Sequence, residues 1–330
     1  MGLQRQCRGL LLLRLGFVLS AVGLCVHLYL EKSWRNQATS LTSPPTRSQT
    51  QQKSAEDSKR TEGGPTHLIH NRKSPRWHID MEPWASESRS LEDEARRFLK
   101  YITAPQVSCL SEVRDGAMLT DVKGAWAVCL DPRYSLVHRM KEKRCRVYSF
   151  GLGADERSLE QSLATSGCDV HCFDPSLKQA HQQKAQMWLH RLSVDWRDPN
   201  PAIVAQQQHA NTKKLATILN DFGHRQVDVL KADMESAEWK ILENLILEGV
   251  LASVGQLLLE VHLHWAGFEV PGDEPSVVRY WFSLLRELQR AGFQLFHVYS
   301  DPNKPRVFLH RDAFNASSAY TLSWVNTQWL

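Results

Sequence analysis

One stretch of the chain combines two glycines and an acid in an order that suits a nucleoside ligand. An apolar run at residues 146–150 leads into a Gly-Leu-Gly turn, and a second apolar run ends at Asp174. Gly151 and Gly153 allow the backbone to approach a ligand closely because they have no Cβ. A carboxylate at the end of the second run can accept hydrogen bonds from two ribose hydroxyls. The spacing therefore predicts a binding site for an adenosine-like group.

The glycine turn differs from one that binds a pyrophosphate. Where a dinucleotide-binding turn has its third glycine this chain has Glu156, and Asp155 precedes it. Two acids at the N-terminus of a helix repel a phosphate anion but tolerate a cation. S-adenosylmethionine carries a sulfonium, an ammonium and no phosphate, so the turn favours this cofactor over NAD. The same reasoning disfavours a nicotinamide dehydrogenase.

A second group of acids and histidines follows two further apolar runs. Asp233 comes directly after residues 227–232, and Glu260, His262 and His264 lie at the end of the next run. Ligands of an open α/β sheet bind beyond the carboxyl ends of its strands, so these side chains are candidates for a functional site. The alternative is that Glu260 and His262 only pair with the backbone or with each other, and that Glu235 and Glu238 in the following segment only stabilise the N-terminus of a helix. Asp233, Glu260 and His262 could also bind a metal ion, although metal ligands usually show tighter sequence spacing.

The elements that must position these residues alternate between strand and helix. We expect strands at residues 146–150, 169–173, 191–194, 227–232, 255–262, 293–299 and 320–325. We expect helices at residues 88–101, 134–140, 155–166, 176–188, 212–222, 236–247 and 275–291. This order predicts an α/β fold, a Rossmann-like seven-stranded, mostly parallel sheet with helices on both faces and an antiparallel last strand.

The N-terminus has the pattern of a targeting segment. Residues 15–30 are almost entirely apolar, and Arg5, Arg8 and Arg14 precede them. The length lies between that of a signal-peptide core and that of a membrane span. Basic residues on the leading side favour keeping that side in the cytoplasm. We therefore expect residues 1–34 to be a signal anchor or a cleaved signal peptide. The rest of the chain would then be secreted, or would face the Golgi or ER lumen as a single-pass type II membrane protein.

Composition separates a stem from a folded domain. Residues 35–84 are rich in Ser, Thr, Gln and Pro and are expected to be a disordered stem, because they offer too little apolar area to bury. Residues 85–330 would then form the domain. Residues 1–75 hold eleven Lys and Arg against four Asp and Glu, so the positive net charge comes from this part. The domain itself has no basic excess, and a nucleic-acid acceptor is not expected.

Five of the seven cysteines fall in the predicted domain. They are Cys109, Cys129, Cys145, Cys168 and Cys172. An odd number leaves at least one thiol free in an oxidising compartment. Buried thiols are the interpretation that we favour, with a link from Cys145 to a neighbouring strand as the alternative. The triplet at Asn315 is an N-glycosylation sequon, which on its own is a weak indication of a glycoprotein.

Four blocks of sequence together resemble the class I S-adenosylmethionine-dependent methyltransferases. The blocks are SFGLGADERSLEQSL, CDVHCFDPS, VDVLKADMESAEWKIL and QLLLEVHLHW. The third resembles the FkbM-type O-methyltransferase motif, in which a strand ends in Lys-x-Asp-x-Glu-Gly. The resemblance covers about residues 85–326, and it implies a methyltransferase that uses S-adenosylmethionine.

The resemblance also implies roles for individual residues. Gly151 and Gly153 would pass close to the methionine part of the cofactor, and Asp155 would hold its ammonium. Asp174 would bind the ribose hydroxyls, and Asp195 or its neighbour Trp196 would lie near the adenine.

The acceptor side follows from the same resemblance. Asp233 would face the transferred methyl group. A hydroxyl acceptor must also lose its proton, and His262 or His264 could take it, oriented by Asp233 or Glu260. The acceptor itself is not indicated.

Two other functions remain open from the sequence. A methyltransferase fold without activity could serve as a binding module in the lumen, since S-adenosylmethionine is made in the cytosol. A lumenal glycosyltransferase would share the layout of anchor, stem and domain, but it would need an Asp-x-Asp motif that this chain lacks.

Overall fold

The computed structural model of the chain describes residues 76–329, with gaps at 111, 115–124, 152–156, 185, 200–211 and 236. Residues 1–75 lie outside the described part, and with them the predicted targeting segment and most of the predicted stem. Within the part that is described, no helix combines the length and the apolar character needed to cross a membrane.

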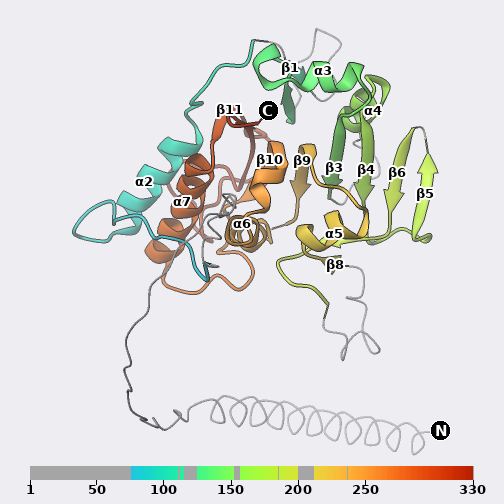
Figure 1. Ribbon diagram of the computed structural model, residues 1–330. Coiled ribbons are helices and arrows are strands. Elements are labelled where there is room, and N and C mark those ends of the chain that lie inside the picture. The colour runs from blue at the N-terminus through green and yellow to red at the C-terminus, as the bar shows by residue number, and fades with distance from the viewer. Residues whose placement is uncertain are drawn as a thin grey trace, which may run out of the picture. The chain divides into compact units, whose positions relative to one another are not determined.

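An eight-stranded sheet forms the centre of the domain, so the predicted number of seven strands is wrong (Figure 1). Its order is β11 (Phe293–Tyr299), β12 (Ala319–Asn326), β10 (Val254–His262), β9 (Val227–Asp233), β3 (Arg146–Phe150), β4 (Asp169–Phe173), β6 (Met187–His190), β5 (His181–Lys184). The strands from β10 to β6 are parallel to their neighbours. The strand β12 is antiparallel to both β10 and β11, so the predicted antiparallel last strand is confirmed.

Helices cover both faces of the sheet, as predicted. The larger apolar core includes buried residues from α2 (Leu91–Ile102), α5 (Leu215–Asp221), α6 (Glu238–Leu247) and α7 (Glu274–Arg290). The smaller core on the other face includes residues from α3 (Leu136–Lys141) and α4 (Ser158–Thr165). The remaining described elements are the strands β1 (Glu112–Arg114), β2 (Ala127–Cys129), β7 (Ser193–Val194) and β8 (Thr212–Lys213), and the 3-10 helices η1 (Pro132–Tyr134) and η3 (Val250–Ser253).

One predicted helix and one predicted strand are wrong. Residues 176–188 contain many good helix formers, but the structure has the antiparallel pair β5 and β6 there. Met187 and Leu189 are buried and alternate with the exposed Trp188, which is the two-residue period of a strand. Pairing of β6 with β4 thus overrides the helix preference. The strand expected at residues 191–194 shrinks to β7, which pairs with β8 outside the main sheet.

Two disulfides replace most of the expected buried thiols. Cys145 is bonded to Cys168, and Cys109 to Cys129. The favoured interpretation of buried thiols is therefore wrong for these four residues, and the alternative link from Cys145 toward a neighbouring strand is the one observed. Among the cysteines that the structure describes, Cys172 is the free one, and burial raises the pKa of its thiol to about 12.

Residues before the predicted domain boundary pack against α7. Ile79 is buried in the larger core, and the Arg76 guanidinium donates to both carboxylate oxygens of Glu287 at 3.1 and 3.0 Å. The Glu82 backbone N–H donates to the Ser283 hydroxyl at 2.9 Å. The packed part of the domain thus extends at least to residue 76, into the segment expected to be stem.

Candidate functional site

The order in which strands are added to the sheet changes side between β3 and β9, which are themselves parallel. This position is therefore the topological switch point of the sheet. From β3 the chain continues outward to β4 and β6, and it then returns to β9 and β10 on the other side. Ligands of open α/β sheets bind at such a point, beyond the carboxyl ends of the strands. Gly151 follows β3 here, and Asp233 ends β9.

The close approach of these two residues requires a glycine. A Cβ at residue 151 would lie 3.3 Å from the Asp233 carbonyl oxygen and 3.4 Å from its Cβ, and Gly151 has a φ of +152°. Few side chains tolerate either condition. The structure therefore places Gly151 at the switch point of the sheet, and its role in binding a nucleoside stays a prediction. Gly153 and Asp155 lie outside the described residues.

Asp174 follows β4 and is buried, with 6% of its surface exposed. Its Oδ1 accepts hydrogen bonds from the backbone N–H of Ser176 at 2.8 Å and from the Ser176 hydroxyl at 2.6 Å. Its Oδ2 lies 3.6 Å from a nitrogen of Arg157. The two bonds from Ser176 fix the orientation of the carboxylate, so Oδ2 is the atom that a ribose hydroxyl would meet.

Asp195 is the next predicted site residue along the chain, and it directly follows β7. Burial raises the pKa of its carboxyl, although the Arg197 backbone N–H donates to Oδ1 at 3.1 Å. The Arg197 guanidinium stacks over the neighbouring Trp196 ring at 4.4 Å. The sequence placed this pair near an adenine, and an aromatic face beside a carboxyl is suited to that base.

Asp233 carries the most unusual carboxyl group of the site. Its Oδ1 is buried and has no hydrogen-bond partner among the described residues. Burial, and after it the charge of Glu260, raises the pKa of this group. A buried oxygen without a partner costs about 1–3 kcal/mol, so the fold keeps it for a reason other than stability. This oxygen, the glycine beside it and the buried Asp174 fit a cationic nucleoside.

His262 and Glu238 form a pair that the sequence did not indicate. Glu238 lies in the first turn of α6 and is 1% exposed. Its Oε1 accepts from the His262 backbone N–H at 2.7 Å and lies 3.3 Å from His262 Nδ1. From the sequence Glu238 is expected only to stabilise the N-terminus of a helix. Its position in the sequence could have indicated a role in the site. Glu238 lies in the first turn of the helix after β9, and that turn is next to the carboxyl end of the strand.

His262 is surrounded by carboxylates. Its Nε2 lies 3.6 Å from Glu260 Oε1, and Lys304 also pairs with Glu260. Burial alone would lower the pKa of His262, but Glu238, Asp233 and Glu260 outweigh it and raise the pKa above its usual value. Lys304 comes from the loop after β11, and nothing in the sequence predicted its role.

His264 differs from His262 in its surroundings. Burial, together with the nearby charge of His262, lowers the pKa of His264. The two rings meet edge to face with centroids 5.8 Å apart. The predicted metal group is brought together, since Asp233, Glu260 and His262 can each offer an atom within 4.8 Å of the others. Two of these three side chains already have partners, because Lys304 pairs with Glu260 and Glu238 pairs with His262.

Comparison with known proteins gives a consistent result. Residues 68–306 match a family model described as "Methyltransferase domain". The chain is 57% identical over 262 residues to "Probable methyltransferase-like protein 24" of Homo sapiens, which covers 78% of this chain and 71% of that protein. The protein of the same name from Rattus norvegicus is 58% identical over 263 residues, with coverage of 78% and 72%.

Among solved structures, the Methanococcus jannaschii fibrillarin pre-rRNA processing protein matches 66% of this chain and 88% of its own, with 10% identity and a TM-score of 0.29.

Proposed function

The chain belongs to the methyltransferase-domain family, and from that premise we propose that it methylates a hydroxyl group of an acceptor in the secretory pathway. S-adenosylmethionine is the methyl donor that membership of this family implies. The lumenal glycosyltransferase alternative does not agree with the family match. The observation that carries the proposal is the Glu238–His262 pair beside Asp233 at the switch point.

When bound, the cofactor supplies an electrophilic methyl group, so the protein mainly orients the two reactants. Gly151 leaves room for the ligand beside Asp233, and Asp174 presents Oδ2 to the ribose. The buried Asp233 carboxylate would attract the positive charge of the sulfonium from the sheet side. These contacts would hold the methyl group toward the acceptor.

The acceptor proton is assigned to His262. In the neutral tautomer whose Nδ1–H donates to Glu238, Nε2 keeps a lone pair that can take the proton. The hydroxyl oxygen would take the methyl group as the donor's carbon–sulfur bond breaks to leave a neutral thioether, and the hydroxyl proton would pass to Nε2. The carboxylates around the ring stabilise the resulting imidazolium. No carboxylate of the described residues pairs with the His264 ring, and burial lowers its pKa, so His264 is the weaker candidate.

Transfer of labelled methyl groups to extracts of glycans, lipids and proteins tests this assignment. We expect His262→Gln to lower the transfer rate by about 100-fold or more, and Glu238→Gln by a smaller factor. His138→Gln, at an exposed histidine that pairs with Glu142, is the matched control and should have no effect. Full transfer by the His262 variant would overturn the proton-acceptor role.

The product distinguishes the chemistry. A methyl ether resists mild alkali, whereas a methyl ester releases labelled methanol, and either an ester or an N-methyl product would contradict a hydroxyl acceptor. A chain that retains S-adenosylmethionine in calorimetry but transfers no methyl to any extract would support the inactive binding module instead.

The secretory location rests on three observations. The two disulfides suit an oxidising compartment, the N-terminal residues have a targeting pattern, and Asn315 is exposed. We expect enzymatic removal of N-glycans to lower the apparent mass of the protein made in animal cells. Asn315→Gln should abolish that shift, because this is the chain's one sequon. A protein of unchanged mass that resides in the cytosol would refute the location.

A further inference from the structure

A second group of metal-type side chains lies at the opposite edge of the sheet from Asp233. Asp169 is the first residue of β4, His171 follows on the same face, and His224 lies in the turn before β9. Each of the three can present one atom within 4.8 Å of the other two. Since β4 and β9 run in the same direction, Asp169 and His224 lie at the amino ends of these strands, and His171 lies in the middle of β4.

Two of these side chains already have the spacing of metal ligands. The Nε2 atom of His171 lies 3.1 Å from Asp169 Oδ2. Tetrahedral zinc with bonds near 2.0–2.1 Å holds its ligand atoms about 3.3 Å apart. An ion placed between them would need only a small rotation of either side chain.

Each candidate histidine has its second ring nitrogen held by another group. The Tyr148 hydroxyl lies 2.6 Å from His224 Nδ1, and His190 Nε2 lies 2.9 Å from His171 Nδ1. Metal-binding histidines almost always have such an outer partner, which fixes the ring and its tautomer. The nitrogens left for a metal ion are then Nε2 of His171 and Nε2 of His224.

The outer partners continue as a chain of imidazoles. The Nδ1 atom of His190 lies 2.8 Å from His181 Nδ1, and His181 is exposed. If a metal ion takes Nε2 of His171, the proton from that nitrogen can be passed along the chain. Nδ1 of His171 then donates to His190, Nδ1 of His190 donates to His181, and the extra proton resides on His181 Nε2. No buried nitrogen is left without a partner.

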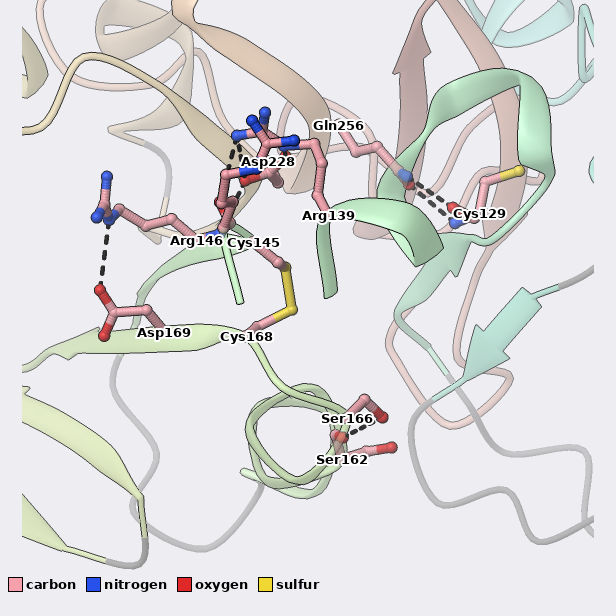
Figure 2. Close-up of a disulfide and its surroundings, with 11 residues drawn as sticks. Cys129, Arg139, Cys145, Arg146, Ser162, Ser166, Cys168, Asp169, Asp228 and Gln256 are labelled. Carbon is pink, nitrogen blue, oxygen red and sulfur yellow. Dashed lines mark hydrogen bonds and ion pairs between the residues drawn. A yellow bond between two sulfur atoms is a disulfide. The ribbon is translucent and has the colours of Figure 1, made fainter. Parts of the chain in front are cut away.

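The chain's covalent structure fixes the position of the carboxylate. The Cys145–Cys168 disulfide joins the residues that directly precede β3 and β4, and Asp169 follows Cys168 (Figure 2). Figure 2 also shows Arg146 directed toward Asp169, with Nε at 3.5 Å from Oδ2. The Asp169 side chain is 40% exposed, so an ion can reach it from solvent.

We propose that Asp169, His171 and His224 bind a divalent transition-metal ion of the zinc class, with water completing the coordination. Imidazole and carboxylate ligands suit zinc. The ion would link the start of β4 to the turn before β9 and would act as a stabilising site, separate from methyl transfer. Arg146 then competes with the ion for Asp169.

Titration of the full chain with Zn²⁺ after chelator treatment tests the site. We expect one ion per chain in calorimetry and a rise in Tm, and Co²⁺ should give the visible absorption of a tetrahedral centre. His224→Gln, in a partly exposed turn, should weaken Zn²⁺ binding by at least about tenfold while the protein still folds. Arg146→Gln should strengthen binding, because it removes the competing charge.

Controls separate this site from the other acidic cluster. His138→Gln and Glu260→Gln should bind Zn²⁺ as the unaltered chain does. The proposal is overturned if no stoichiometric ion binds, if His224→Gln binds with full affinity, or if Glu260→Gln is the variant that loses the ion.

Discussion

Strand β9 carries an aspartate near each end, and the structure surrounds the two in opposite ways. Asp228, near the amino end, is 1% exposed, and both of its oxygens accept hydrogen bonds from Arg139. Its Oδ2 also accepts from the Arg146 backbone N–H at 2.8 Å (Figure 2). Asp233, at the carboxyl end, has a buried oxygen without a partner among the described residues and a second acid beside it.

The contrast shows where the fold gives up stability. Buried polar groups are normally satisfied, and the amino edge follows this rule with an ion pair and a disulfide. The carboxyl edge breaks it at Asp233 and again at Glu238 Oε2. Two carboxylate oxygens without a partner among the described residues, close together beyond the carboxyl ends of the strands, are expected where a ligand completes the hydrogen bonds.

Replacing Asp228 should give the largest change in stability. Asp228→Ala leaves the Arg139 guanidinium, 15% exposed, without its counter-charge. Breaking a buried pair in this way costs about 3–5 kcal/mol. Urea unfolding measures it, with Arg96→Ala, at an exposed arginine of α2, as the control. A loss below 1 kcal/mol would remove the claim that the amino edge is the stabilised one.

Removing the disulfide at the amino edge should cost slightly less. Cys145 and Cys168 are separated by 23 residues in sequence, and closing a loop of that size stabilises a protein by about 3 kcal/mol. The double variant Cys145→Ala and Cys168→Ala should therefore unfold at a lower urea concentration. The same change at Cys172, which is not bonded, should leave the transition closer to its original position. Equal losses in the two variants would point to packing and not to the crosslink.

Acid should act in opposite directions on His190 and Asp233, which lie at the carboxyl ends of β6 and β9. Burial lowers the pKa of His190 to about 3, so the unfolded chain binds a proton below pH 6.5 that the folded chain does not. The free energy of unfolding is therefore not reduced by His190 above pH 6.5, and His190 lowers it by about 2 kcal/mol at pH 5. Asp233 has a raised pKa, so its protonation in acid favours the folded state.

Chelator-treated protein shows the histidine effect without a bound metal ion. His190→Asn should flatten the loss between pH 6.5 and 5, measured by Tm. If the variant shows the same slope as the original chain, His190 is not responsible for the acid sensitivity.

Replacing Asp233 should have the smallest effect on stability. Asp233→Asn removes the repulsion from Glu260 while keeping the shape of the side chain, so the free energy of unfolding should change by less than about 1 kcal/mol or increase. Methyl transfer should nevertheless fall by at least about tenfold, since the charge beside the cofactor is lost. A variant that is both strongly destabilised and fully active would reverse the comparison between the two edges.

The glycine turn and the order of strands and helices were determined by local sequence. A glycine is needed at residue 151 because φ is +152° and because Asp233 lies close to it. The sequence already indicates this position, since a glycine directly follows an apolar strand. The alternation of short apolar runs with helical patterns determined a parallel sheet covered on both faces. The family resemblance followed from blocks that are each contiguous in sequence.

Contacts between distant segments decided the rest. The helix expected at residues 176–188 became a strand pair because β4 offers a parallel partner, and strand pairing depends on a neighbour that local propensity does not describe. Cys145 and Cys168 meet because β3 and β4 lie side by side. Glu238 meets His262, and Lys304 meets Glu260, across separations of 24 and 44 residues. Sequence determined which residue types stand at the strand ends, and only the folded sheet determined which of them touch.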